Sequence, residues 1–587
     1  MSERPVVICF SAAGAAIAGR IAAFLGAEYL PHEMTARTSA DQVRKILTRA
    51  WLEERCIIGV CAAGILIRLL KDSIGRKEIE PPLIAISTDG KHVVPLLGGH
   101  RGANRLAREL AANLGATAAI TTASETGIGV VLDDPPQGWV LAVGQDVKPF
   151  ASKLLAGEKV RLVGPAPWLS EAGLVADDGA VAITVSEELP GDPSALHYHP
   201  MTLIAGVGCE RGCDPAELIG LIETTLASHR LSPLSVAALA TIELKSDEPA
   251  ILGAAAHFGV PLRLFTAAEL AAEHARLPNP SAIVEAEVGT PGVAEAAALK
   301  AGALLIEKRK SSRATCAVGR SPAPLEVEGL GRAVGALFVV GIGPGDPVSR
   351  TPEATAALKS ATDWVGYGLY LDLAADLRAG QSLHPFPIGE EAARVKKALA
   401  LAAAGHRVAL VSSGDPGIYA MASLVFEEIE KTSARTAVTV IPGISALQSA
   451  AAKAGALLGH DFAAVSLSDL LTPRETILTR LEAAAAGDFV VALYNPRSGR
   501  RTGFIEQAKA IFLRHRPPAT PVVVASNLGR NGESVRITTL TEFDPASVDM
   551  LTIVLIGSSQ SRAFTRGSGA TLAYTPRGYA SKGEGSE

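Results

Sequence analysis

Short apolar runs alternate with longer segments of helical periodicity through the first third of the chain. The helical patterns include Thr38–Arg55 and Asn104–Leu114. Short runs separated by helical segments are typical of strands buried in a parallel sheet. The pattern therefore predicts a doubly wound parallel α/β domain. The expected strands are Val6–Phe10, Cys56–Val60, Leu83–Ile86 and Ala118–Thr122.

The same alternation starts again twice. Met201–Gly208 is a strand that enters a glycine turn, and it is followed by an expected helix at Asp214–His229 and a strand at Val236–Glu243. After a Pro- and Gly-rich stretch without periodicity, Arg320–Gly335, a further α/β unit begins. Its expected strands are Leu337–Val340, Val408–Ser412, Val438–Ile441, Phe489–Leu493, Val522–Ala525 and Leu551–Ile556.

These patterns predict a multidomain α/β chain, because 587 residues are too many for one hydrophobic core. The last residues are polar and glycine-rich, which is typical of a disordered tail. We expect α/β domains at 1–135 and 201–320, a small middle domain at 136–200, a linker at 321–335, a further α/β domain at 336–575 and a tail at 576–587.

Composition excludes several classes of protein. Hydrophobic residues make up 48% and charged residues 20% of the chain, which is typical of folded proteins. A formal net charge of -5 gives no reason to expect nucleic acid as a partner. Apolar runs shorter than the ~18 residues of a membrane span predict no membrane segment. All six cysteines precede residue 320, and we expect reduced thiols in a cytoplasmic protein; the three-residue spacer between Cys209 and Cys213 is not that of most zinc sites, so no metal is predicted.

Five strand-to-loop transitions in the last unit carry the candidate chemistry. Phe338–Asp346 reads Phe-Val-Val-Gly-Ile-Gly-Pro-Gly-Asp, and Thr351-Pro352 behind it has the pattern of a helix start. Val408–Tyr419 repeats the pattern of an apolar run and a Gly-Asp-Pro loop. Ligands of open α/β sheets bind at the carboxyl ends of strands, so we expect one ligand site there. The other three transitions are Ile441–Ala446, Leu493–Arg497 and Leu555–Ser559.

The order GIGPGD, SSGDPGIYAMA, IPGISA, ALYNPRS and LIGSSQSR is similar to the tetrapyrrole methylase family. The resemblance implies a two-lobed α/β domain that uses S-adenosylmethionine in sirohaem or cobalamin synthesis. Ser466–Glu475 and Tyr494–Pro496 resemble the precorrin-3B C-17 methyltransferase branch, which contracts the ring. Gly557-Ser558-Ser559 departs from the Gly-Asn-Ser or Gly-Asn-Thr of family members, which affects side-chain roles only. The resemblance places the cofactor against Pro344, Ser413, Gly414, Asp415, Ile418, Ser445, Ala446, Tyr494 and Gly557.

The implied reaction is attack of an electron-rich macrocycle carbon on the methyl group of the cofactor, for which positioning supplies most of the catalysis. Precorrins carry several carboxylates, so a substrate site should present forked cations. We expect His460 and Asp461 as an acid/base pair for ring contraction, although surface histidines are common. The candidate substrate cations, which could also form a solvated basic face, are Arg474, Arg497, Arg500 and Arg501.

The first 320 residues resemble the cobalt-precorrin-5A hydrolase family, through Val94–Ala107, Gly64–Arg68 and the stretch Gly206–Gly212. Members of that family open a δ-lactone on the macrocycle and release acetaldehyde. Gly98 and Arg101 depart from the family, which usually has Ser and Gly there. Other positions that match the family are Leu244–Glu248, Glu295–Ala298 and Thr315–Val318.

Candidate catalytic residues of this half are His100, Lys245 and Glu248, which could polarise or protonate the lactone. A turn histidine is more often structural, and a solvated salt bridge explains Lys245 and Glu248 equally well. His197 and His199 would lie on one face of a strand, where they could bind cobalt or another metal.

We therefore interpret the chain as a fusion of two corrin-pathway modules that act on a tetrapyrrole, with a homodimer expected through the methylase domain. Other enzymes of the pathway are possible partners. Two alternatives remain open: a methylase acting at C-11 or on uroporphyrinogen, and an N-terminal half that binds corrinoids without catalysis. The sequence leaves open whether the substrate carries cobalt.

Overall fold

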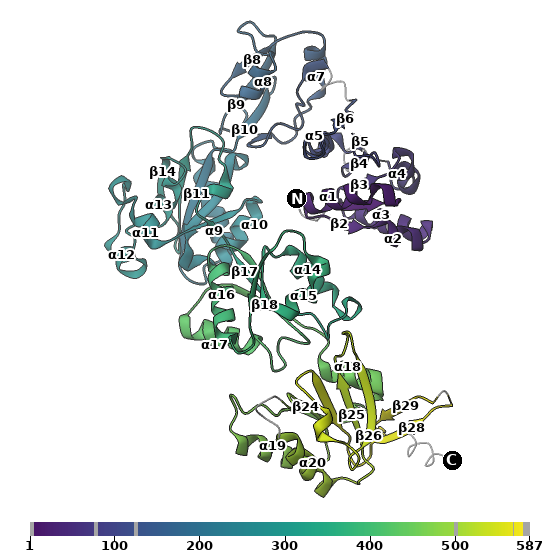
Figure 1. Cartoon of the computed structure of the whole chain (residues 1–587). Helices are drawn as coiled ribbons and strands as arrows, with labels where there is room; N and C mark the ends of the chain where they lie inside the picture. The colour runs from purple at the N-terminus through teal and green to yellow at the C-terminus, as the bar shows by residue number, and fades with distance from the viewer. Residues whose placement is uncertain (1–4, 76–79, 122–126, 498–502, 568, 579–587) are drawn as a thin grey trace, which may run out of the picture. The chain divides into compact units, whose positions relative to one another are not determined.

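The computed structural model describes residues 5–75, 80–121, 127–497, 503–567 and 569–578. The chain divides into two compact units, Met1–Val334 and Gly335–Glu587. Both are built from sheets flanked by helices, as the sequence predicts for an α/β chain (Figure 1). Among the helices of the described ranges, none combines the length and apolar character that a bilayer crossing requires.

The first sheet of unit 1 has the strand order β2-β1-β3-β4-β5-β6. Its strands are β1 (Val6–Cys9), β2 (Glu28–Leu30), β3 (Ile57–Val60), β4 (Leu83–Ile86), β5 (His92–Leu97) and β6 (Thr117–Ala118). Its helices are α1 (Ala15–Leu25), α2 (His32–Arg37), α3 (Ala40–Leu52), α4 (Ala63–Leu70) and α5 (Ala103–Leu114), with short 3₁₀ helices η1 (Ala12–Gly14) and η2 (Gly99–Arg101).

This sheet departs from the expected parallel order at one pair of strands. β4 and β5 are antiparallel, whereas the other neighbouring strands are parallel. The reason is the short turn between them, in which Gly90 has φ +72° and the Ser87 amide donates to the His92 carbonyl at 3.0 Å. A parallel connection needs a crossover of a dozen or more residues, so such a turn permits only a hairpin.

The second sheet of unit 1 has the order β7-β10-β9-β8. Its core includes Tyr198, which is fully buried, packs edge-on against Trp168 at 5.4 Å and donates from its hydroxyl to the Leu132 carbonyl at 2.6 Å. The elements are β7 (Trp139–Leu141), α7 (Lys148–Leu155), β8 (Val160–Val163), α8 (Pro167–Glu171), β9 (Val181–Val185) and β10 (Leu196–Pro200).

The third sheet of unit 1 has the order β14-β15-β11-β12-β13-β16, and β11, β12 and β13 are parallel. Its strands are β11 (Leu203–Cys209), β12 (Val236–Ile242), β13 (Leu262–Phe265), β14 (Ala303–Lys310), β15 (Ala314–Arg320) and β16 (Arg332–Ala333). Its helices are α9 (Pro215–Ala227), α10 (Pro249–Phe258), α11 (Ala267–Ala271), α12 (Ala282–Val288) and α13 (Ala294–Leu299), with 3₁₀ helices η3 (Pro233–Ser235), η4 (Glu243–Lys245), η5 (His274–Arg276) and η6 (Val327–Gly329).

The stretch that follows β15 packs against the third sheet. β16 pairs with the edge strand β13 in antiparallel register. The guanidinium of Arg263, on β13, donates to the carbonyl groups of Glu328, Leu330 and Gly331. These contacts lie within the stretch 321–335, for which the sequence predicts a linker.

The first sheet of unit 2 is entirely parallel, with the order β19-β18-β20-β17-β21. As the sequence predicts, a helix begins behind Thr351, whose hydroxyl accepts from the Ala354 amide at 3.1 Å. The strands are β17 (Ala336–Gly341), β18 (Asp363–Tyr367), β19 (Ser382–Phe386), β20 (Arg407–Ser412) and β21 (Ala437–Ile441). The helices are α14 (Pro352–Ser360), α15 (Gly368–Asp372), α16 (Glu391–Ala403) and α17 (Ala422–Thr432), with η7 (Pro347–Ser349) and η8 (Ala375–Leu377).

The second sheet of unit 2 is mixed, with the order β23-β24-β27-β25-β26. β27 runs antiparallel to both of its neighbours, β24 and β25. The elements are α18 (Ala446–Ala454), β23 (Phe462–Ser466), α19 (Arg474–Ala486), β24 (Val490–Tyr494), α20 (Phe504–His515), β25 (Pro521–Ser526), β26 (Ser534–Thr539), η9 (Pro545–Ser547) and β27 (Thr552–Ile556). A small third sheet contains β22 (Gly455–Ala456), β28 (Arg562–Thr565) and β29 (Thr571–Tyr574).

Candidate functional site

Three backbone loops meet at the carboxyl ends of β17, β20 and β21. Gly343 and Gly414 exchange two hydrogen bonds, from the Gly343 amide at 3.2 Å and from the Gly414 amide at 2.7 Å. A Cβ atom at Gly443 would lie 2.2 Å from the Gly414 carbonyl oxygen, and one at Gly341 would lie 2.5 Å from the same oxygen. Because only glycine permits this approach, the place where the loops converge is lined by backbone amides and carbonyls. Such a surface suits a ligand that is bound through its polar edges.

Asp415 fixes two of these loops to each other. Its carboxylate accepts from the Gly417 amide at 2.8 Å and from the Gly443 amide at 3.2 Å. Ser445 follows in the third loop, where it is buried at the start of α18 and its amide donates to the Gln448 side chain at 3.0 Å. Asp415 therefore connects two loops through hydrogen bonds. Its carboxylate could accept a hydrogen bond from a ligand only through the remaining lone pairs.

Two tyrosines join the first sheet of unit 2 to the second. Tyr494, at the end of β24, donates to the Ser445 hydroxyl at 3.4 Å and accepts from the Leu447 amide at 3.2 Å. Burial raises the pKa of Tyr494, although these two hydrogen bonds oppose the rise. Tyr419 lies 5.2 Å from Tyr494 between ring centroids and donates to the Ala464 carbonyl of β23 at 2.8 Å. Its backbone φ of +51° is unfavourable for a bulky residue, and such strain is concentrated at functional loops.

Sequence reasoning missed Arg530, which reaches the same place from the loop between β25 and β26. Its Nη2 donates to the Ser413 hydroxyl at 2.7 Å and its Nε to the Pro344 carbonyl at 3.0 Å. The sequence contains a pattern that could have pointed to this loop, because the apolar run Val522–Ala525 is followed by the turn residues Asn527 and Gly529. In the structure these two residues have φ angles of +52° and +66°. β25 is parallel to β24, so its carboxyl end lies at the edge of the sheet where Tyr494 lies.

Gly557 does not join the other cofactor candidates. β27 is antiparallel to β24, and Ile556 pairs with Val491 near the start of that strand. Gly557 therefore lies at the edge of the sheet opposite Tyr494. The expectation that all five strands end at one edge fails for β27, because strand direction depends on pairing and not on the local pattern. The structure brings together Pro344, Ser413, Gly414, Asp415, Ile418, Ser445, Ala446 and Tyr494 through the loops described above.

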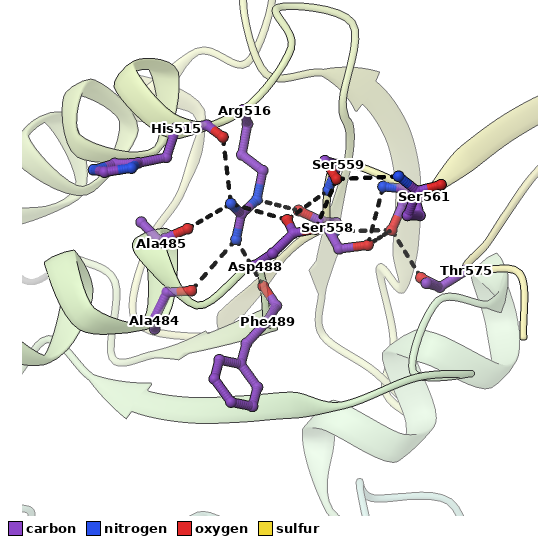
Figure 2. A network of polar contacts seen from close by, with 12 residues as sticks. Ala484, Ala485, Asp488, Phe489, His515, Arg516, Ser558, Ser559, Ser561 and Thr575 are labelled. Atoms are coloured by element: carbon purple, nitrogen blue, oxygen red, sulfur yellow. Dashed lines mark hydrogen bonds and ion pairs between the residues drawn. The ribbon is translucent and has the colours of Figure 1, made fainter.

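The loop that begins at Gly557 belongs instead to a polar network around Arg516, which Figure 2 shows. The buried Arg516 side chain pairs with Asp488 at 3.0 Å and donates to the carbonyls of Ala485 at 2.5 Å and Phe489 at 3.2 Å. The Ser559 amide and hydroxyl donate to Asp488 at 2.8 and 2.6 Å. Burial lowers the pKa of Arg516, and the Asp488 carboxylate opposes this effect. The network satisfies the last carbonyl groups of α19, which is a structural role.

The predicted acid/base pair, His460 and Asp461, lies away from the converging loops. Both side chains are exposed, with 3.4 Å between the imidazole Nδ1 and the carboxylate. Asp461 precedes β23, and its carbonyl accepts from the Val490 amide at the start of β24. The pair therefore lies at the same edge as Gly557, opposite Tyr494.

The predicted substrate arginines are only partly described. Arg474 begins α19, and its guanidinium lies over the Phe504 ring at 5.1 Å. Arg497 donates to the Pro545 carbonyl at 3.2 Å. Arg500 and Arg501 lie outside the described residues.

In unit 1 the structure brings Lys245 and Glu248 together at the carboxyl ends of β11 and β12. The Glu248 side chain is 1% exposed and accepts from the Gly212 amide at 3.0 Å. Its second oxygen lies 3.3 Å from Arg211 Nη1 and 3.9 Å from Lys245 Nζ, and it accepts no hydrogen bond from the described residues. Burial is the main reason why the pKa of the nearby Cys209 thiol rises to about 11. Two cations and a buried carboxylate thus face each other in one loop cluster.

His100 belongs to a different loop of unit 1. Its backbone lies in η2, between β5 and α5 of the first sheet. Its side chain lies outside the described part of the structure.

His197 and His199 form a buried pair on β10, with 4.7 Å between ring centroids. His197 Nε2 contacts the Ser186 hydroxyl at 3.3 Å, and His199 Nδ1 contacts the Ser186 carbonyl at 3.1 Å. Burial lowers the pKa of both imidazoles, and that of His199 to about 4. Within the described ranges no cluster of three possible metal-ligating side chains occurs. Both rings are buried and are held by contacts with Ser186.

Comparison with known proteins assigns families to three parts of the chain. Residues 336–544 match the model of the tetrapyrrole (corrin/porphyrin) methylases. Residues 45–125 match the N-terminal model of cobalamin synthesis G, and residues 203–319 match its C-terminal model. The chain belongs to the tetrapyrrole methylase family, since a relative of 42% identity is matched over 98% of its length.

That relative is a precorrin-3B C(17)-methyltransferase from a Sinorhizobium species, aligned over 42% of this chain. The cobalamin biosynthesis protein CobIJ of Mycobacterium tuberculosis is 44% identical over 42% of this chain and 49% of its own length. The chain thus spans about half the length of these CobIJ relatives. Among solved structures, the methyltransferase CobJ is 41% identical, over 41% of this chain and 100% of that one, with a TM-score of 0.39.

Proposed function

We propose that unit 2 methylates C-17 of precorrin-3B, or of cobalt-factor III, with S-adenosylmethionine as methyl donor and with contraction of the ring. The proposal is supported by the relative named precorrin-3B C(17)-methyltransferase, 98% of whose length aligns with 42% of this chain. The observation that carries the cofactor part is the close approach of three loops, where a Cβ atom at Gly341 or Gly443 would lie within 2.5 Å of the Gly414 carbonyl oxygen.

The residues at the junction fit the proposed cofactor. Backbone amides and carbonyls of the three loops can hold its adenine and ribose, and Tyr494 offers an aromatic face. The cofactor supplies a methyl group as electrophile. The chain contributes orientation and water exclusion, because the attacking carbon is made reactive by the macrocycle itself.

Arg530 supports this proposal from the second sheet of unit 2. It donates to the Pro344 carbonyl of one loop and to the Ser413 hydroxyl of another, so it fixes the position of these two loops relative to each other. His460 and Asp461 are not assigned the acid/base step of ring contraction, because both are exposed at the opposite edge of the sheet. Arg474 and Arg497 remain proposed contacts for macrocycle carboxylates.

We propose that unit 1 is a module of the same pathway that acts on the macrocyclic lactone. Glu248, Lys245 and Arg211 form the cluster that would bind and polarise it. A buried carboxylate with one oxygen free of hydrogen bonds can accept a proton, and the adjacent cations can stabilise a developing oxyanion. The alternative, a module that binds corrinoids without catalysis, uses the same cations to hold carboxylates. We further propose a cytoplasmic protein that forms a homodimer through unit 2.

The central test is incubation of the full chain with S-adenosylmethionine and either precorrin-3B or cobalt-factor III, followed by mass spectrometry. The expected product has gained one methyl group and shows the spectrum of a contracted ring. A methylated product with an intact ring would instead favour a C-11 or uroporphyrinogen methylase. Absence of any methylated product from both substrates would refute the proposal for unit 2.

Unit 1 is tested separately with cobalt-precorrin-5A and an assay for acetaldehyde. The unmodified chain should release acetaldehyde, and Glu248→Gln should abolish the release while methylation by unit 2 continues. If the unmodified chain binds the macrocycle and releases none, unit 1 is a binding module.

A further inference from the structure

A buried arginine beside the proposed cofactor site, Arg394, pairs with no acidic side chain among the described residues. Arg394, on α16, is 4% exposed, and its Nη2 donates to the Pro387 carbonyl at 3.0 Å. Its Nη1 lies 3.8 Å from the sulfur of Met421, and its Nε has no hydrogen-bond partner in the described residues. No ion pair joins Arg394 to any acidic side chain of the described ranges. A guanidinium keeps its charge in proteins, and a buried charge without a partner is costly. We therefore expect an anion to bind near Arg394.

The positive charges of both Arg394 and Arg530 act on Tyr370. The guanidinium of Arg530 is 6.0 Å from the centre of the Tyr370 ring. Burial raises the pKa of Tyr370, while the positive charges of Arg530 and Arg394 act in the opposite direction. Glu391, an acidic group that also acts on this tyrosine, accepts from the Gly389 amide at 3.1 Å. The Tyr370 hydroxyl makes no hydrogen bond within the described residues, so it is available as a donor.

These residues border the loops that converge at the proposed cofactor site. Arg530 holds Ser413 and Pro344, as described above. Met421, which covers Arg394, precedes Ala422, whose amide donates to the Pro416 carbonyl of the Gly414 loop at 2.9 Å. The positive charge is therefore placed at one end of the ligand site and not on an unrelated surface.

We propose that Tyr370 and Arg530 bind a carboxylate of the ligand and that Arg394 supplies a second positive charge from behind them. The subsite rests on the proposed function, which supplies two carboxylate sources: the amino-acid end of the methyl donor and an acid side chain of the macrocycle. Tyr370 donates through its hydroxyl, and Arg530 donates through the guanidinium N–H groups that Pro344 and Ser413 leave free. Arg394 is a positioning residue, because Met421 separates it from the ligand.

The test measures binding to the full chain by titration calorimetry, so that it does not depend on turnover. The probes are S-adenosylhomocysteine, methylthioadenosine (which lacks the amino-acid carboxylate) and cobalt-factor III. The variants are Arg530→Gln, Tyr370→Phe and Arg394→Met, with Arg394→Lys as the conservative replacement that keeps the charge. Arg378→Gln is the matched control, because Arg378 is an exposed arginine of the same unit.

A charge-assisted hydrogen bond lost from a partly buried site weakens binding by about tenfold or more. If the carboxylate is that of the methyl donor, Tyr370→Phe weakens S-adenosylhomocysteine about tenfold and leaves methylthioadenosine unchanged. Arg530→Gln also releases Pro344 and Ser413, so it should weaken both nucleosides, and S-adenosylhomocysteine by about tenfold more than methylthioadenosine. If it belongs to the macrocycle, cobalt-factor III alone is weakened. Arg394→Lys should retain binding in either case, whereas Arg394→Met should lose it. If Arg394→Met fails to fold, the affinity of Tyr370→Phe for the three probes tests the subsite instead.

Two results would overturn the subsite: unchanged affinity for all three probes, or equal losses for S-adenosylhomocysteine and methylthioadenosine. The second result would mean that the variants only distort the loops. Failure of the proposed function looks different, because a chain that methylates neither macrocycle can still discriminate the two nucleosides through Arg530. Conversely, if all variants methylate as the unmodified chain does, the proposed function stands and the carboxylate subsite is refuted.

Discussion

Replacing Gly443 with alanine should force apart the loops at the proposed cofactor site. The added Cβ atom would lie 2.2 Å from the Gly414 carbonyl oxygen and 2.8 Å from the Gly341 carbonyl group. Ordinary contact begins at 3.4 Å, so the backbone must move by about 1.2 Å. Both neighbours are backbone atoms, and the Gly414 carbonyl already accepts from the Gly343 amide, so no flexible side chain can absorb the movement.

Overpacking of this kind costs about 1–3 kcal/mol. The displacement also lengthens the hydrogen bond from the Gly443 amide to Asp415, which is 3.2 Å long. If about 2 kcal/mol of this cost appears as lost affinity, S-adenosylhomocysteine should bind about 30-fold more weakly.

Titration calorimetry with S-adenosylhomocysteine measures the effect, and a thermal melt of each variant confirms that it is folded. Gly368→Ala is the matched control, because a Cβ atom at this first position of α15 meets nothing within 4 Å. It should bind like the unmodified chain. The reasoning is refuted if Gly443→Ala binds S-adenosylhomocysteine within about threefold of the control.

Two further changes test the structure away from the proposed cofactor site. Arg516→Met leaves the buried carbonyls at the end of α19 without their donor, so urea denaturation should show a loss of about 3 kcal/mol, while S-adenosylhomocysteine affinity stays unchanged; a stability within about 1 kcal/mol of the unmodified chain would contradict this. Burial lowers the pKa of His199 from 6.5, the value for an exposed histidine, to about 4 in the folded chain. Between these two pH values the unfolded chain therefore binds more protons than the folded chain. The free energy of unfolding should fall as the pH drops through this range. His199→Gln should flatten this dependence in pH-dependent melts, and an equally steep profile would exclude the buried imidazole as its cause.

The local pattern of the sequence was sufficient for the elements and for most of the cofactor loops. The run before Gly341 forms β17, and Thr351-Pro352 begins α14 as the hydroxyl and proline predict. In a parallel sheet every strand ends at the same edge, so Ser413 and Ser445 could be assigned to one place from their positions after apolar runs. The family resemblance added the ligand that this edge would take.

Strand direction was not determined by the local pattern. β27 has the same apolar character as its neighbours, yet it runs antiparallel to them, and this places Gly557 at the opposite edge of the sheet. Direction depends on which strands pair after the chain has folded, and periodicity within a strand carries no information on it. The exposed position of His460 has the same origin, since it lies at the amino end of β23.

The sequence by itself therefore determined the α/β class, the glycine loops and the family. The tertiary structure decided which of these loops share a site, and it added Arg530 from a loop 186 residues after Pro344. It also revealed that Arg394 is buried with no acidic partner among the described residues, which no local pattern of charges shows. The physical reason is the same in each case: backbone preferences act between near neighbours in the sequence, whereas burial and charge pairing depend on residues that only the fold brings together.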